Sequence, residues 1–315
     1  MTEFDLIRQL SSRFSVPDGV IGIGDDCAVI GDTLVTTDLL AEGVHFLLDG
    51  ISPFDLGFKS AAVNISDIAA MGGLPKYAFL SIALPTVNDG WLAAFSDGFA
   101  SCCHRYRVTL LGGDTSASAG GIFINVTLMG ECPHGTALLR SGARPGDLIC
   151  VTGTLGDSAA GLRLIQEMAD QVSHDENVLL HRHCHPEPRV DEGIALRNCP
   201  GVHSMMDISD GIAADLPHIL EASGVGATVD VATLPLSEEL RRLCASRSWD
   251  PVDLALCGGE DYELLFTIAP GTQPPVPCTV IGSITALDAA SALDASASRI
   301  TWLGGKPSYV GFRHF

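Results

Sequence analysis

The sequence SPFDLGFKSAAVNISDIAAMGG occupies residues 52–73 and carries a clear helix signal. Ser52 followed by Pro53 is typical of a helix N-terminus, because serine caps the first turn and proline is tolerated at the first helical position. Apolar residues then recur at helical spacing until Gly72-Gly73, which predicts the helix end. Asp67 lies late in this apolar segment, where an unpaired charge is costly to bury. We therefore expect a buried helix over 54–71 that carries one ionisable side chain.

Short apolar runs alternate with amphipathic stretches on both sides of this helix, which is the α/β pattern. At 315 residues the chain is long enough for two domains. A segment rich in turn-forming residues, 140–147, predicts the boundary, with an N-terminal α/β domain over 1–140 and a C-terminal α/β domain over 141–315. The polar segment 171–188 is interpreted as a connector. The predicted strands are 34–38, 77–84, 108–111, 122–129, 148–152, 227–231 and 263–268, and the other predicted helices are 89–105, 158–168 and 210–222.

Aspartates fall next to glycines and at predicted strand ends. Each one alone is compatible with a turn or a helix cap. Together, carboxylates at strand ends converge on the crevice where α/β proteins bind ligands. The positions concerned are Asp25, Asp26, Asp38, Asp67, Asp114, Asp207, Asp210, Glu260 and Asp261.

Such a crevice needs cations, because two carboxylates about 4 Å apart near a protein surface repel by roughly 4 kcal/mol. Basic side chains near these motifs are few, with Lys59, Arg140 and Arg144 the evident candidates. Oxygen ligands from Asp and Thr, with no His or Cys at ligand spacing, favour magnesium over zinc. Magnesium would also make the site hospitable to ATP in a chain with 38 acidic and 18 basic residues. The same net charge of −20 argues against nucleic acid and anionic membranes as partners.

Other nucleotide and metal signatures are missing or incomplete. The sequence has no Gly-x-x-x-x-Gly-Lys-Ser/Thr loop, and Gly22-Ile23-Gly24 lacks the third glycine of the dinucleotide pattern. The group His181-Arg182-His183-Cys184-His185 has alternating spacing in a polar segment, which is more typical of a solvated loop than of a zinc site. The acidic start and the lack of a membrane-length apolar run favour a cytoplasmic protein.

At six motifs in order the sequence resembles the thiamine-monophosphate kinases, within the aminoimidazole ribonucleotide synthetase-like superfamily, and a terminal Gly311-Phe312-Arg313-His314-Phe315 adds to the match. The resemblance covers nearly the whole chain. It implies a two-domain fold of mixed sheets with flanking helices, several magnesium ions, and a homodimer formed through the N-terminal half. It also implies ATP-dependent phosphorylation of thiamine monophosphate to thiamine diphosphate. The motifs are residues 22–28, 36–46, 64–72, 112–115, 207–211 and 258–266.

The resemblance also implies roles for individual residues. The implied magnesium ligands are Asp26, Thr36, Thr37, Asp38, Asp67, Asp114, Asp207 and Asp210, and the catalytic residues among them are Asp67, Asp114 and Asp210. The implied ATP contacts are Gly113, Asp114, Arg140 and Ser209. The implied contacts to the thiamine phosphate are His45, Glu260 and Phe312, where many relatives have tryptophan at the last position. The tyrosine that some relatives place near ATP has no counterpart around Ser96-Asp97.

The implied reaction suits these residues, because the acceptor is a phosphate oxygen that is already anionic and needs no strong general base. Positioning and neutralisation of the phosphate oxygens are then the main requirements. Two alternatives stay open at this level. One is another ATP-dependent enzyme of the superfamily, such as aminoimidazole ribonucleotide synthetase or selenophosphate synthetase. The other is a non-enzymatic divalent-cation-binding protein.

Overall fold

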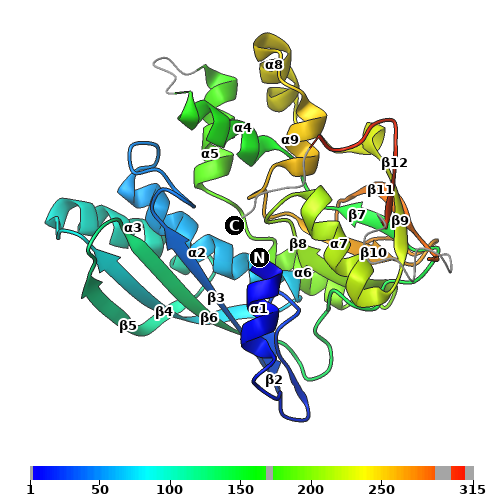
Figure 1. The fold of residues 1–315 in the computed structure, drawn as a ribbon, viewed down its shortest axis with the longest axis horizontal. Helices are drawn as coiled ribbons and strands as arrows, with labels where there is room; N and C mark the ends of the chain where they lie inside the picture. Colours follow the sequence, from blue (N-terminus) through cyan, green and yellow to red (C-terminus); the bar gives the residue numbers. More distant parts are fainter. Residues whose placement is uncertain (1–2, 168–172, 288–298, 309–315) are drawn as a thin grey trace.

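The computed structural model describes residues 3–167, 173–287 and 299–308 and shows two six-stranded sheets, each with its own helices (Figure 1). The first sheet has the order β1-β2-β3-β6-β4-β5, and only β4 and β5 pair in parallel. Its strands are β1 Val20–Ile21, β2 Ala28–Ile30, β3 Thr33–Ala41, β4 Leu74–Leu84, β5 Thr109–Ala117 and β6 Phe123–Glu131, and the helices of this half are α1 Glu3–Ser11, α2 Pro53–Ala70 and α3 Asp89–Arg105.

The second sheet has the order β12-β9-β11-β7-β10-β8, and only β12 and β9 pair in parallel. The predicted α/β fold with mixed sheets and flanking helices is therefore confirmed. The strands are β7 Leu148–Val151, β8 Val202–Asp207, β9 Gly226–Asp230, β10 Leu264–Ile268, β11 Thr279–Thr285 and β12 Ile300–Leu303. The helices are α4 Asp157–Gln166, α5 His174–Cys184, α6 Val190–Arg197, α7 Ile212–Ser223, α8 Glu238–Arg247 and α9 Pro251–Cys257, with a short 3-10 turn at Val231–Thr233.

Helix α2 joins the two halves of the molecule. Its N-cap is Ser52, whose hydroxyl accepts a hydrogen bond from the backbone N–H of Asp55 at 3.1 Å, and Pro53 takes the first helical position as predicted. Of its 18 residues, 14 are buried, because it packs on β3, β4 and β6 on one side and on α6 and β8 on the other. In Figure 1 it runs along the N-terminal sheet toward the C-terminal one. A polar side chain on α2 therefore faces the boundary between the two sheets.

Glycine allows α3 to approach α2 closely. A Cβ atom at Gly98 would lie 1.8 Å from the carbonyl oxygen of Phe54, and one at Gly57 would lie 2.0 Å from that of Phe95. The two helix backbones thus meet without side chains between them. This contact fixes α2, and with it Asp67, against the N-terminal half.

The expected ends of two strands need correction. Strand β3 continues to Ala41 and β5 continues to Ala117, so Asp38 and Asp114 lie within strands rather than at their ends. Strand β3 extends beyond its expected end because β6 pairs with it along its whole length. Strand β5 extends to Ala117 because β4 pairs with it that far.

The polar segment 171–188 was expected to be a connector, but its described part forms helix α5. A reciprocal capping box starts the helix, because Ser173 accepts from the backbone N–H of Glu176 and Glu176 accepts from that of Ser173. Leu179 and His183 are buried as α5 packs against α4 and α8. Tertiary packing of one helix face therefore outweighs the polar composition.

Candidate active site

A cluster of carboxylates lies where α2 meets the C-terminal sheet. Asp26 comes from the loop between β1 and β2, Asp67 from α2, and Asp207 from the end of β8. Oxygen atoms of the three all lie within 4.8 Å of one another. Asp38 of β3 is close enough to raise the pKa of Asp67. Four distant segments of the sequence thus meet at this point.

Each carboxylate of the cluster has a partner on a different element. The Thr36 hydroxyl donates to Asp67 Oδ2 at 2.5 Å, and the Ser66 hydroxyl donates to Asp207 Oδ2 at 2.5 Å. Arg140 Nη2 donates to Asp26 Oδ1 at 2.5 Å. The Ser66 contact connects α2 directly to β8, so the cluster forms only when the two halves of the chain are docked.

The cluster is costly to keep in its ionised form. Burial, together with neighbouring carboxylates, raises the pKa of Asp67 well above its usual value and raises that of Asp207 to about 7. The pKa of Asp38 rises to about 6 for the same two reasons. Burial and the carboxylate of Asp25 also raise the pKa of Asp26, although the Arg140 guanidinium opposes this. One arginine does not balance four carboxylates that are buried or half-buried, so the geometry calls for further positive charge.

A divalent cation fits this site. Asp26 Oδ2 is buried and has no hydrogen-bond partner in the described part of the chain, while Asp67 and Asp207 each place a carboxylate oxygen within 4.8 Å of one of Asp26. Among the described residues, this is the one group of side chains with the spacing of a metal site. The donors are all oxygens, which suits Mg²⁺ better than zinc.

Several residues predicted as magnesium ligands are not among the three whose oxygens gather within 4.8 Å of one another. The Thr37 hydroxyl is 3.1 Å from that of Thr127 of β6, on the face of β3 opposite to Thr36. Asp114 is exposed on β5, where its carboxylate accepts from the backbone N–H of Thr115. Asp210 follows β8 closely, and its backbone N–H donates to Asp215. The roles of Thr37, Asp114 and Asp210 in metal binding remain predictions.

The residues expected to bind ATP and the acceptor come from several parts of the fold. The backbone carbonyl of Ser209 accepts from the N–H of Glu260 at 2.8 Å, which places the loop 258–263 beside the end of β8. His45 Nδ1 accepts from the N–H of Ala41. Gly113 lies in edge strand β5, and Phe312 is outside the described residues.

The basic side chains do not all serve the cluster. Arg140 contacts Asp26, but Lys59 forms its ion pair with Glu260 at 2.9 Å, and the backbone of Arg144 binds Asp147. The sequence interpretation also missed Ser66 as a partner of Asp207 and His183 as a partner of Lys59. A serine and a lysine inside an apolar helix were the available signals for Ser66 and Lys59, whereas nothing local indicates His183.

The histidine group does not gather its imidazoles at one point. His181 and His185 lie one helical turn apart, so their rings stack with centroids 4.7 Å apart. His185 also contacts Asp55 of α2. His183 lies on another face of α5 and is buried against Lys59. Helical spacing, rather than a solvated loop, separates these side chains.

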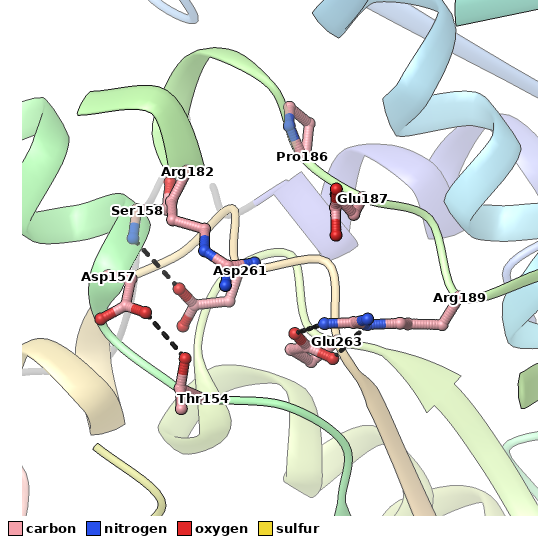
Figure 2. A pocket seen from close by; sticks show the side chains of 9 residues that line it. All are labelled: Thr154, Asp157, Ser158, Arg182, Pro186, Glu187, Arg189, Asp261 and Glu263. Carbon is pink, nitrogen blue, oxygen red and sulfur yellow. Dashed lines mark hydrogen bonds and ion pairs between the residues drawn. The ribbon is translucent and has the colours of Figure 1, made fainter. Parts of the chain in front are cut away.

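The cavity beside the loop 258–263 is too small for a substrate. The cavity is lined by polar and charged side chains, as Figure 2 shows. They include Thr154, Asp157 and Ser158 near the start of α4, the basic Arg182 and Arg189, and the acidic Asp261 and Glu263. Its volume of about 10 Å³ admits no more than one water molecule. The lining residues instead hold the loop in place.

Comparisons with known proteins agree with this geometry. The family described as AIR synthase related protein, N-terminal domain, matches residues 24–132, and the corresponding C-terminal domain matches residues 144–287. Thiamine-monophosphate kinase of Escherichia coli strain K12 is 44% identical over 303 residues, covering 90% of this chain and 88% of the relative. That of Bacillus subtilis is 40% identical over 281 residues, covering 85% and 84%. This chain belongs to the thiamine-monophosphate kinase family.

Solved structures of the family have the same fold. The structure of AaThiL complexed with AMPPCP and TMP aligns with a TM-score of 0.89 and 36% identity, over 100% of this chain and 97% of that chain. Thiamine monophosphate kinase from Aquifex aeolicus aligns with a TM-score of 0.82 and 36% identity, over 96% of each chain. The thiamine-monophosphate kinase family thus has the overall fold of this chain.

Proposed function

We propose that this chain transfers the γ-phosphoryl group of ATP to the phosphate of thiamine monophosphate, giving thiamine diphosphate and ADP. The observation that carries the proposal is the cluster of Asp26, Asp67 and Asp207, in which one carboxylate oxygen has no hydrogen-bond partner among the described residues, in a chain of this family. A relative of the same fold binds AMPPCP and TMP. These observations favour phosphoryl transfer over another reaction of the superfamily.

We further propose that Asp26, Asp38, Asp67 and Asp207 hold magnesium, with Thr36 and Ser66 orienting two of the carboxylates. Bound magnesium would supply positive charge for the phosphate oxygens. Arg140 holds Asp26 in place and, with Ser209 and Gly113, is proposed to contact ATP. His45, Glu260 and Phe312 are proposed to contact the acceptor. None of these side chains needs to act as a strong base, because the attacking phosphate oxygen is already anionic.

The proposal is tested by product formation from ATP, magnesium and thiamine monophosphate, with free thiamine as a parallel acceptor. We expect thiamine diphosphate from the monophosphate alone, and a rate that falls to background when EDTA removes magnesium. Chromatography of the products measures both. Folded protein that yields no thiamine diphosphate with ample magnesium would contradict the proposed function.

A homodimer through the N-terminal sheet is also proposed. The face of this sheet opposite α2 exposes Leu39, Tyr77, Phe79 and Phe123, and the register of β3, β6 and β4 places the polar Thr37, Asn125 and Thr127 between them. The edge strand β5 is exposed over its whole length. Exposed apolar side chains on this face and an open edge strand favour a protein partner, and a second copy is the partner that the family resemblance implies.

This interface gives a test of its own. Phe79→Glu places a charge on this face of the sheet, beside the exposed Tyr77, so we expect it to convert a dimer to a monomer in light scattering. Tyr106→Glu, a partly buried aromatic residue outside this face, is the matched control and is expected to leave the mass unchanged. A wild-type protein that is monomeric at micromolar concentration would contradict the dimer.

The location and the domain division are proposals as well. None of the helices in the described part of the chain is long and apolar enough to cross a lipid bilayer. All ten cysteines are free and eight are buried, which supports the proposal of a reducing, cytoplasmic location. We propose that the domains divide at residues 140/141, between β6 and β7, because the first sheet ends at Glu131 and the second begins at Leu148.

A further inference from the structure

Glu260 is held by an ion pair that comes from the other half of the molecule. Lys59 of α2 donates to Glu260 Oε2 at 2.9 Å, and the lysine side chain is only 1% exposed. The Glu260 side chain is 26% exposed. Solvent is therefore excluded from Lys59 but reaches part of the Glu260 side chain.

His183 of α5 completes the arrangement. Its Nε2 lies 3.3 Å from Lys59 Nζ, and its Nδ1 lies 3.0 Å from the Ser158 hydroxyl and 3.3 Å from Glu260 Oε2. An ammonium group can only donate, so Nε2 accepts and the ring proton is on Nδ1, next to Glu260 and Ser158. Burial and the Lys59 charge lower the pKa of His183 to about 3, which keeps the ring neutral.

The backbone on either side of Glu260 is fixed independently. Asp261 accepts from the N–H groups of Gly156 and Ser158 at the start of α4, and Glu263 accepts from Arg189 Nε at 2.7 Å, as Figure 2 shows in part. Glu260 itself has a φ of +65°, a left-handed conformation that a non-glycine residue adopts rarely. The main chain thus places Cβ of Glu260, while the direction of its carboxylate depends on Lys59 and His183.

We propose that Lys59 and His183 are positioning residues that hold the Glu260 carboxylate toward the cationic and amino groups of the acceptor substrate. This inference rests on the proposed function, because thiamine monophosphate carries a positively charged thiazolium ring and an aminopyrimidine. Both are groups that an anionic carboxylate binds. Lys59 and His183 act through Glu260 and contact neither ATP nor the reacting oxygens.

A structural role for the same contacts would have a different signature. A buried interdomain ion pair that merely holds the two halves together would, when broken, lower stability and impair both substrates alike. A positioning pair affects the acceptor specifically. If Lys59 acts through Glu260, replacing Lys59 should have no further effect in a protein that already lacks the Glu260 carboxylate.

A double-variant cycle separates these roles. Lys59→Met and Glu260→Gln are made singly and together, and kcat and both KM values are measured with ATP, magnesium and thiamine monophosphate. We expect each single variant to raise the acceptor KM about 30-fold, as for loss of a hydrogen bond to a charged group, with the ATP KM unchanged. The double variant should be no worse than Glu260→Gln alone.

Two histidine variants test the tautomer and provide a second route if Lys59→Met folds poorly. His183→Gln keeps an acceptor near the Nε2 position and should retain most of the acceptor affinity, whereas His183→Asn loses it. His203→Gln is the matched control, because His203 is also a buried partner of a carboxylate, Asp147 at 2.8 Å, but lies away from the loop. The control should lower the melting temperature without changing either KM.

The pH dependence gives an independent readout. The groups that face Glu260 are Lys59 of α2, His183 and Cys184 of α5, His45 after β3, and Tyr262 of the same loop. Burial alone would raise the pKa of Glu260, but the Lys59 charge holds it below its usual range. Without Lys59 the main group that opposes the effect of burial is lost, so the pKa of Glu260 rises. The acceptor KM of Lys59→Met should therefore increase as the pH falls through this raised pKa, while that of the wild type stays level over the same range.

The outcomes distinguish the two proposals. Wild-type protein that makes no thiamine diphosphate overturns the proposed function and, with it, this inference. If the wild type is active but the effects of Lys59→Met and Glu260→Gln on the acceptor KM multiply in the double variant, only the positioning role is overturned. Equal increases in the KM of ATP and of the acceptor also overturn it. An acceptor-specific increase that does not add to Glu260→Gln supports it.

Discussion

Replacing Asp67 with asparagine is expected to reduce turnover by at least about 1,000-fold while the protein remains folded. The substitution keeps the shape of the side chain, and the Thr36 hydroxyl can still donate to the amide oxygen. It removes one negative charge from the cluster of Asp26, Asp67 and Asp207, which is where we propose that magnesium binds. Steady-state kinetics at saturating magnesium measure the effect. Near-normal turnover under these conditions would contradict the role of Asp67.

The same variant should be more stable than the wild type when no metal is present. Burial and the neighbouring carboxylates raise the folded-state pKa of Asp67, so ionisation of the carboxylate destabilises the fold as the pH rises through that pKa. In EDTA at pH 8 the melting temperature of Asp67→Asn should therefore exceed that of the wild type. At pH 5 the difference should shrink, because the wild-type carboxyl group is then protonated. Magnesium should raise the melting temperature of the wild type more than that of the variant.

Asp147→Asn is the matched control for this experiment. Asp147 is also a buried aspartate, but it pairs with His203 and with the backbone of Arg144, away from the cluster. Its replacement removes favourable contacts, so it should lower the melting temperature equally with and without magnesium and leave turnover unchanged. An Asp67→Asn protein that is destabilised in EDTA to the same extent would show that repulsion within the cluster is not significant.

The parts of the fold that local sequence determines were predictable. Helix α2 follows from the Ser52-Pro53 start and the apolar spacing, and α3 begins and ends at Asp89 and Arg105 as expected. The polar segment that forms α5 was misinterpreted, although Ser173 and Glu176 have the spacing of a capping box. Composition suggested a connector, whereas the packing of Leu179 and His183 against neighbouring helices decides the structure.

The site was predictable as a set of acids but not as a set of contacts. Glycine-flanked aspartates indicated that carboxylates converge, and the structure brings Asp26, Asp67 and Asp207 together. The contact from Ser66 to Asp207 spans 141 positions of sequence, and no local pattern encodes it. The same is true of the contact between Lys59 and Glu260, which depends on how the two halves dock. Pairings of this kind follow from tertiary structure alone.

Gly113→Ala is expected to have the second large effect, on both stability and ATP use. Gly113 has a φ of +155°, and a Cβ atom there would lie 1.7 Å from the carbonyl oxygen of Leu80 in the neighbouring strand β4. Edge strand β5 must therefore move away from β4, which we expect to reduce the free energy of unfolding by about 3 kcal/mol. Urea denaturation measures this change.

Gly112→Ala is the matched control, one residue earlier in the same strand. Its Cβ atom would meet only the Phe79 ring, at 3.5 Å, so the strand can stay in place and stability should change little. Because Gly113 and Asp114 are proposed to contact ATP, a displaced β5 should also lower kcat/KM for ATP about 100-fold in Gly113→Ala, as expected for misplacement by about 1 Å. The acceptor KM should change much less, since Glu260 lies on the other half of the molecule. A folded Gly113→Ala protein with a wild-type KM for ATP would show that β5 does not contribute to the ATP site. Equal effects of Gly112→Ala and Gly113→Ala would show that the close approach of Gly113 to Leu80 does not cause the loss of stability.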